Sequence, residues 1–164
     1  GKGMPDWTFG FNIGAEWKGF DFSAFFYATI GNDVMDVTKR TDVPYANLPA
    51  YMLDRWTGPG SSNTIPRLSL SQDNNNWQSS DLYVKNGAYL RLKTIQLGYT
   101  LPKNITKKAF IDNLRFYVAS ENLFTLTGYD GFDPEISSGG TSLGVDRGVY
   151  PQSRTVTIGA SITF

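Results

Sequence analysis

The sequence predicts an all-β chain whose antiparallel strands form a segment of a transmembrane β-barrel. Three stretches, 7–17, 20–30 and 154–164, place apolar side chains at alternate positions, although the second face of 20–30 also holds Phe25 and Tyr27. This period-two pattern is typical of strands that meet different surroundings on their two faces. The polar face of the last stretch is small and neutral, and each stretch is about twice as long as a usual soluble strand. Strands of an outer-membrane barrel have this length and this alternation.

Composition and charge narrow the classes of function. The 164 residues include fifteen basic and fifteen acidic side chains, so the net charge gives no reason to expect a nucleic-acid partner. The absence of Cys and His removes disulfides, thiolate metal sites and the commonest general base. No apolar run is long enough for a transmembrane helix. We therefore expect no enzyme and no cofactor. Because no export signal follows Gly1, we also expect the chain to be the C-terminal piece of a longer protein.

The first two strands, 7–17 and 20–30, are expected to form a hairpin through the turn Lys18-Gly19. Ten residues of strand rise about 33 Å, and a tilt near 40° leaves about 25 Å of height. This height matches the apolar band of an outer-membrane barrel. The aromatic girdle at its edges is assigned to Trp7, Trp17, Phe20 and Tyr99.

The remaining elements continue the same pattern. A long connection, 31–83, contains four prolines and a polar tract, with a short helix expected within 45–56. The later segments are a strand at 88–101, a short connection with a helical turn within 106–111, a strand at 114–126, a long connection at 128–153 and a final strand at 154–164. Because the short turns of such barrels are periplasmic, we assign the long loops to the exterior and the C-terminus to the periplasm.

Five strands cannot close a barrel, since the smallest known barrels have eight. An open sheet in lipid would also leave unpaired backbone groups along both edges. We therefore expect the strands of this chain to pair with further strands of a larger barrel.

Three stretches together carry a family resemblance. They are 89–102 (YLRLKTIQLGYTLP), 114–125 (LRFYVASENLFT) and 129–135 (YDGFDPE). In this order before a final Phe, they resemble the C-terminal end of SusC/RagA-type TonB-dependent transporters of Bacteroidota. The chain has Ser120-Glu121 where that family usually has Gly-Gln.

This resemblance implies that residues 1–164 are the last five strands of a 22-stranded barrel in the bacterial outer membrane. The plug domain and the TonB box would lie outside this chain. The implied partners are the rest of the barrel and its plug, a SusD-like surface lipoprotein, TonB-ExbB-ExbD, outer-membrane lipid and the barrel-assembly machinery. That machinery reads a C-terminal signal, which Thr157, Gly159, Ile162 and Phe164 resemble.

Two patterns suggest chemistry but have simpler explanations. Gly140-Thr141-Ser142-Leu143-Gly144 fits the G-x-S-x-G motif of hydrolases, but the chain has no His to activate the Ser. Asp130, Asp133 and Glu135 offer oxygen ligands that are a weak candidate for a Ca²⁺ site. A turn held by Asx-type hydrogen bonds is the favoured alternative for these carboxylates.

Aromatic residues in the predicted loops are the best candidates for ligand contacts, because Tyr and Trp stack on the C–H faces of sugars and add a polar group. The alternative, which we favour for most of them, is that they pack the loops or contact a partner protein. Arg91 would bind a carboxylate or sulfate, or lie solvated at the rim. The candidate ligand-binding residues are Trp56, Trp77, Tyr89, Arg91, Tyr129 and Tyr150.

The predicted function is nutrient import across the outer membrane, with oligosaccharide as the cargo. Three alternatives remain at this point: import of peptides by the same kind of protein, a passive porin or adhesin barrel, and a soluble β-sandwich that binds glycans. The last alternative predicts strands of five to six residues with charged outward faces, which the sequence does not favour.

Overall fold

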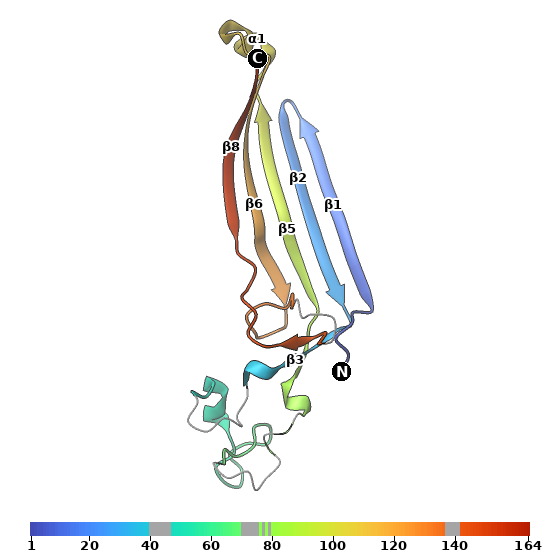
Figure 1. Ribbon diagram of the computed structural model, residues 1–164, viewed down its shortest axis with the longest axis vertical. Helices are drawn as coiled ribbons and strands as arrows, with labels where there is room; N and C mark the ends of the chain where they lie inside the picture. Colours follow the sequence, from blue (N-terminus) through green and yellow to red (C-terminus); the bar gives the residue numbers. More distant parts are fainter. Residues whose placement is uncertain (40–46, 70–75, 77, 79, 137–141) are drawn as a thin grey trace.

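A computed structural model describes residues 1–39, 47–69, 76, 78, 80–136 and 142–164. Five long strands form one antiparallel sheet in the order β1-β2-β5-β6-β8, with the two chain termini near opposite ends (Figure 1). The strands are β1 (Trp7–Trp17), β2 (Phe20–Ile30), β5 (Tyr89–Thr100), β6 (Asn113–Thr127) and β8 (Thr155–Thr163). The predicted all-β, antiparallel fold class is confirmed.

The strand bounds follow the alternation in the sequence. β1 and β2 coincide with the stretches 7–17 and 20–30, and the other three strands differ from their expected ranges by one residue at each end. Lys18 and Gly19 both have positive φ values, 48° and 88°, as a two-residue turn between twisted strands requires. Directly paired residues share a face, so the apolar side chains gather on one side of the sheet.

Aromatic pairs join neighbouring strands on this apolar face. The rings of Phe11 and Phe26 stack with their centroids 4.9 Å apart. The ring centroids of Phe20 and Tyr99 lie 4.5 Å apart, near the short turn between β1 and β2. Such cross-strand pairs stabilise a sheet by roughly 0.2–1 kcal/mol each.

A bulge in β5 changes which side chains reach each face. Thr94 pairs with Phe25 of β2, but Phe26, the next residue along β2, pairs with Leu92, so Lys93 is an extra residue. In a regular strand, Arg91 would lie on the same face as Ile95, because both positions are odd. The bulge instead leaves Leu92 on the apolar face and directs Arg91 to the polar one. The alternation in the sequence does not predict this bulge.

β6 contains a matching irregularity. Glu121 pairs with Thr94 and Phe124 with Leu92, which leaves two residues of β6 opposite Lys93. The first of them, Asn122, has a φ of 51°, a left-handed conformation that Asn adopts more readily than most residues. The ladder between β6 and β8 also ends at Glu121; beyond it, within the described residues, β6 pairs as a strand with β5 alone, while the side chain of Asn122 donates to the carbonyl of Ser153 at 3.1 Å.

A second, small sheet lies at the long-loop end of the molecule (Figure 1). β3 (Asp33–Asp36) pairs antiparallel with β4 (Val84–Asn86) and parallel with β7 (Val145–Asp146). Three short 3₁₀ turns accompany it: Val37–Lys39, Ala50–Asp54 and Asp81–Tyr83. The expected helix within 45–56 is therefore a single short turn, with 45 and 46 outside the described residues. The small sheet was not predicted.

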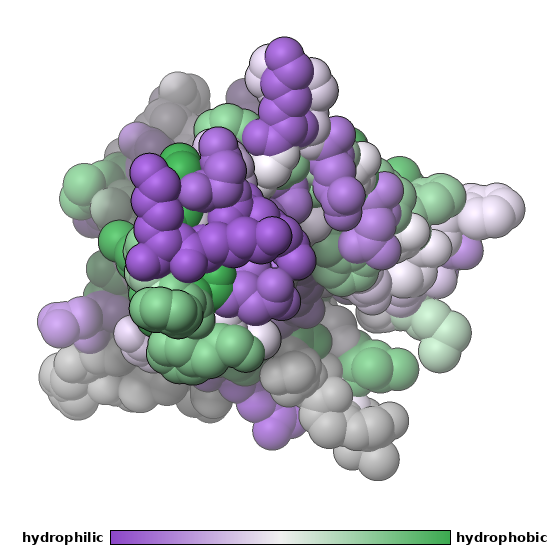
Figure 2. All heavy atoms as spheres, turned by 90° about the horizontal axis from the view of Figure 1, so that it is seen from above, coloured by the Kyte–Doolittle hydropathy of each residue, from purple (hydrophilic) through white to green (hydrophobic). Residues whose placement is uncertain are grey.

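The connection between β5 and β6 forms the other end, which Figure 2 views directly. It contains α1 (Lys103–Thr106) and a 3₁₀ turn at Lys107–Ala109. The expected helical turn within 106–111 thus begins three residues earlier. Among the described residues, no helix has the length and apolar character needed to cross a membrane.

Candidate functional site

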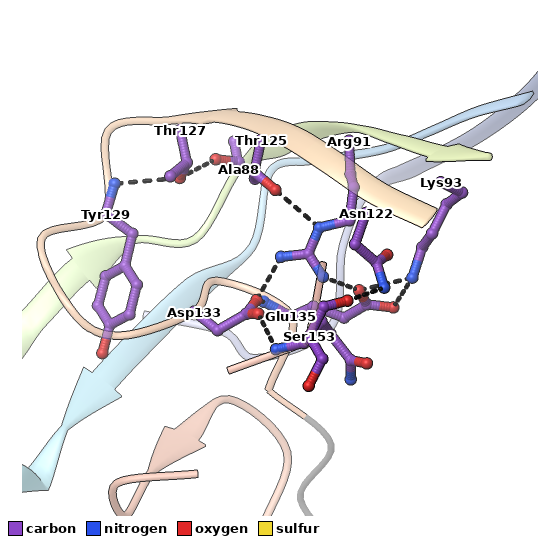
Figure 3. A network of polar contacts seen from close by, with 11 residues as sticks. Ala88, Arg91, Lys93, Asn122, Thr125, Thr127, Tyr129, Asp133, Glu135 and Ser153 are labelled. Carbon is purple, nitrogen blue, oxygen red and sulfur yellow. Dashed lines mark hydrogen bonds and ion pairs between the residues drawn. The ribbon is translucent and has the colours of Figure 1, made fainter. Parts of the chain in front are cut away.

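A network of ion pairs joins β5 to the segment that follows β6 (Figure 3). The guanidinium of Arg91 donates to Asp133 and to Glu135, both at 2.6 Å, and to the hydroxyl of Thr125 at 2.8 Å. The side chain of Lys93 adds a bond of 2.6 Å to Glu135. Arg91 is only 2% exposed. A buried charge requires partners of this kind, and a guanidinium that bridges two carboxylates supplies directional bonds as well as charge.

Asp133 extends the network to a third segment of the chain. One of its oxygens accepts the backbone N–H of Glu135 at 2.8 Å, which makes an Asx turn. The other oxygen accepts the backbone N–H of Gln152 at 2.8 Å. Burial alone would raise the pKa of Asp133, but these two N–H groups and Arg91 outweigh it and lower the pKa. Asp133 therefore stays ionised and fastens β5, its own turn and the segment before β8 together.

A second polar cluster lies beside the small sheet. The hydroxyl of Tyr129 donates to Asp146 at 2.6 Å, and the other oxygen of Asp146 accepts the backbone N–H of Gly148 at 2.8 Å. Burial and the bond to Asp146 raise the pKa of Tyr129. Lys39 bridges Asp36 and Asp130, at 3.2 and 2.7 Å. Burial would lower the pKa of Lys39, but the two carboxylates outweigh it and raise the pKa.

The weak calcium candidate is not assembled in this structure. Asp130 bonds to Lys39, whereas Asp133 and Glu135 bond to Arg91 and Lys93. No group of three or more possible metal ligands occurs among the described residues. The sequence placed the three carboxylates close together along the chain, but each is already paired with a cation of the protein.

The structure separates the predicted ligand-binding residues into two groups. Tyr89, Arg91 and Tyr129 are buried, which agrees with the favoured alternative that the two tyrosines pack the loops; a ligand contact of Arg91, which lines a hollow at this end, stays a prediction. Trp56 and Tyr150 are accessible, with 39% and 83% of their surface exposed. Trp77 lies outside the described residues. The favoured expectation for Arg91, a solvated rim position, is wrong, because the side chain is 2% exposed and the bulge at Lys93 turns it into the network.

Two hollows lie at the long-loop end. One, of about 390 Å³, lies over the ion-pair network, and a second, of about 510 Å³, adjoins Trp56. The first is lined partly by residues that the sequence analysis missed: Asn122, Thr125, Thr127, Phe132, Gln152 and Arg154. No local pattern identifies these residues, because they come from β6 and from two later segments that meet only in the fold.

The other predicted residues lie along the sheet. Trp17, Phe20 and Tyr99 are near the short-turn end, and Trp7 is at the opposite end of β1. In the proposed assembly signal, Ile162 and Phe164 are exposed, whereas Gly159 leaves room for the ring of Tyr117, which a larger residue would collide with. Of the G-x-S-x-G motif, residues 140 and 141 lie outside the described residues.

Comparison with curated proteins identifies relatives over the full chain. The TonB-dependent receptor P3 of Formosa agariphila is 33% identical over 172 residues, which covers 100% of this chain and 17% of that receptor. The TonB-dependent receptor SusC of Bacteroides thetaiotaomicron is 27% identical, covering 99% of this chain and 16% of SusC. The chain thus spans about a sixth of the length of these relatives. No family model matches the chain.

Solved structures agree with this result. The RagAB peptide importer in its closed-closed state superposes with a TM-score of 0.80 at 28% identity, covering 99% of this chain and 18% of that one. The same importer in its open-open state gives a TM-score of 0.78, and the match covers 98% of this chain and 17% of the importer chain. The matched region is the C-terminal part of the barrel in each case.

Proposed function

Because this chain belongs to the SusC/RagA-type TonB-dependent transporters, we propose that it forms part of the barrel wall of an outer-membrane nutrient importer. The observation that carries the proposal is the five-stranded antiparallel sheet with one continuous apolar face. The side chains on that face are largely exposed in this chain; they include Phe9, Phe11, Ile13, Leu97, Phe116, Val118 and Ile158. Contiguous exposed apolar surface of this extent marks an interface, and here the other side of the interface is lipid.

The sheet edges support a larger barrel. Within the described residues, β1 pairs only with β2 and β8 only with β6. Unpaired backbone groups along these edges are costly in lipid, so further strands of the parent barrel would pair with them. The proposed whole is a barrel of 22 strands with a plug, the number that the family resemblance implies.

The opposite face would line the lumen beside the plug. Arg115 donates to Asp21 there, with Nε 2.9 Å from the carboxylate. Gly98 lies beneath this ion pair, and any larger side chain at position 98 would collide with both partners. An ion pair of this kind suits the water-filled interior of a barrel and not a face in contact with lipid. The lumen face is thus proposed to contact the plug, with no covalent chemistry of its own.

The long-loop end is proposed to face the exterior and to form part of the ligand cavity. Trp56 and Tyr150 remain the proposed aromatic contacts there, and the two hollows supply polar groups beside them. Oligosaccharide is the first proposed cargo, since accessible Trp and Tyr rings suit sugar faces. Peptide is the second, because the solved structures that resemble this chain are described as peptide importers.

The proposed partners follow from the same family membership. A SusD-like surface lipoprotein would cover the long-loop end, and TonB, ExbB and ExbD would act through the plug. The barrel-assembly machinery would recognise the end of β8. These partners belong to the whole receptor, of which this chain is a section.

The first experiment is peptide mapping by mass spectrometry of detergent-extracted material that contains this chain. We expect plug and upstream barrel peptides in stoichiometric amounts, together with a lipoprotein. A stable product consisting of residues 1–164 alone, soluble without detergent, would overturn the barrel proposal. Binding of defined oligosaccharides and defined peptides to the purified receptor, measured side by side, then decides the cargo.

A further inference from the structure

We propose that the connection between β5 and β6, residues 101–112, binds the headgroups of anionic phospholipids in the leaflet at the short-turn end of the barrel. This inference rests on the proposed membrane location of the sheet. It concerns a surface that plays no part in cargo binding. Its support comes from the position of the connection, its charge and its exposed apolar side chains.

The position of the connection suits the headgroup layer. Tyr99, Trp17 and Phe20 lie at the short-turn end of the apolar face, where a girdle meets the polar region of a bilayer. α1 and the following 3₁₀ turn begin only four residues beyond Tyr99 and extend past the end of the β1–β2 hairpin (Figure 1). The headgroup region adds about 5–8 Å to each side of the hydrocarbon core. The four residues of α1, at about 1.5 Å each, have a length of about 6 Å, which is comparable.

The charge of the connection is complementary to phosphate groups. Residues 101–112 contain three lysines, Lys103, Lys107 and Lys108, and one acid, Asp112. Lys103 bonds to Asp112 at 3.0 Å. Among the ion pairs of the described residues, none involves Lys107 or Lys108. Two unpaired ammonium groups at this depth are placed to meet phospholipid phosphates, which attract lysines near a membrane surface.

Apolar side chains of the same segment point away from the protein. Phe110 is 90% exposed, and Ile105 is also exposed. Phe110 has a φ of 58°, an unusual conformation for a bulky residue. Bonds from its own N–H to Lys107 and from the N–H of Ile111 to Thr106 hold this turn. The fold thus presents a large aromatic ring to its surroundings, although burying it would be favourable in water.

The end of β8 enlarges this surface. The N–H of Asp112 donates to the carbonyl of Thr163 at 2.8 Å, which ties the connection to the last strand. The neighbouring Phe164 is exposed as well. Viewed from this end, hydrophilic and apolar surfaces lie side by side (Figure 2). Exposed aromatic rings next to snorkelling lysines are the arrangement found at a membrane interface.

The test uses the complete receptor, purified in mild detergent and titrated with phosphatidylglycerol or with neutral phosphatidylcholine. Native mass spectrometry measures the lipid that stays bound. The test variant is Lys107→Gln/Lys108→Gln, and the control is Arg147→Gln, which removes an exposed cation beside β7 at the long-loop end. We expect the affinity for phosphatidylglycerol to fall by roughly one order of magnitude in the double variant. The control and a Lys107→Arg/Lys108→Arg variant should bind as the parent does.

Heat-modifiable mobility on a gel reports barrel assembly separately. An assembled parent that binds both lipids equally, or a double variant with unchanged phosphatidylglycerol binding, would overturn this inference and leave the proposed function intact. A parent that is soluble and not heat-modifiable would overturn the proposed function itself. Where the double variant fails to assemble, the two single Lys→Gln variants decide the question by the same comparison.

Discussion

At the scale of single residues, Arg91 is the side chain on which the long-loop end depends most. It makes bonds to Asp133, Glu135 and Thr125 while almost fully buried. A buried ion pair is weak support for stability relative to an apolar replacement of both partners, but loss of one partner leaves an uncompensated charge. The network therefore holds the segment after β6 in one conformation, and each of its members is sensitive to substitution.

Substitution of Arg91 by Met should release the segment 128–136. The change leaves Asp133 buried without its cation, at a local cost of about 3–5 kcal/mol. Hydrogen exchange should show loss of protection at the backbone N–H groups of Glu135 and Gln152. Lys103→Gln is the control, because that lysine and its partner Asp112 are 66% and 61% exposed. Exposed pairs contribute only about 0–1 kcal/mol. Equal protection in the Arg91 variant and the parent would contradict the role given to the network.

The same segment should respond to acid. The pKa of Asp133 is lowered in the native state, so the stability it contributes is fully present above its unfolded pKa of about 3.9. That contribution is lost as the pH falls through the lower native pKa. Exchange at Gln152, corrected for the intrinsic effect of pH, should accelerate in this range. An Asp133→Asn variant should lack this dependence, and a similar acceleration in that variant would assign the titration to another group.

At the scale of elements, the bulges in β5 and β6 decide which side chains lie on the apolar face of the sheet. The alternation of Ile95, Leu97 and Tyr99 predicts an outward position for Arg91, whereas the extra residue Lys93 reverses the pattern beyond it. A one-residue shift exchanges the two faces of everything that follows. The bulge therefore explains how one strand combines an apolar membrane face with a buried ion-pair network.

Insertion of one Ala after Lys93 should impair the barrel far more than substitution of Lys93 by Ala. With a second extra residue in β5, either the pairing of 89–92 with β2 and β6 is disrupted or Arg91 turns to the lipid face. A charged Arg there costs about 2–4 kcal/mol near the midplane and less near the interfaces. Lys93→Ala removes the ion pair with Glu135 but keeps the register. Heat-modifiable mobility and surface levels measure the difference, and equal assembly of both variants would contradict the assigned register.

Phe11→Arg tests the apolar face at the middle of β1. The substitution removes the stacking on Phe26 and places a charge in lipid, at about 2–4 kcal/mol near the midplane. Asn12→Arg, the next residue along and on the opposite face, should assemble better because the lumen is wet. Normal mobility and normal surface levels for the Phe11 variant would contradict the proposed lipid contact of this face.

At the scale of the whole molecule, the two ends of the sheet carry different structural features. The long-loop end carries the small sheet, the ion-pair network and two hollows. The short-turn end carries the girdle residues Trp17, Phe20 and Tyr99 and the basic connection with α1. In the proposed importer, the long-loop end would take part in cargo capture and the short-turn end would lie in the headgroup layer.

Removal of Phe164 from the complete receptor should lower barrel yield more than it lowers transport per assembled barrel. The proposed assembly signal at Thr157, Gly159, Ile162 and Phe164 acts before the barrel is complete, so its loss should affect how much protein is inserted. Surface quantification measures yield, and uptake divided by surface level measures transport. An unchanged yield would count against the signal.

The sequence by itself determined the strands, the antiparallel class and the faces of the regular strand segments, because period-two alternation can be read from neighbouring residues alone. It also carried the family resemblance. Only the tertiary structure decided the bulge at Lys93, the small sheet of β3, β4 and β7, and the partners of Arg91. Arg91 and Asp133 are 42 positions apart. Their contact depends on strand register and loop path, which are fixed by long-range packing that no local pattern encodes.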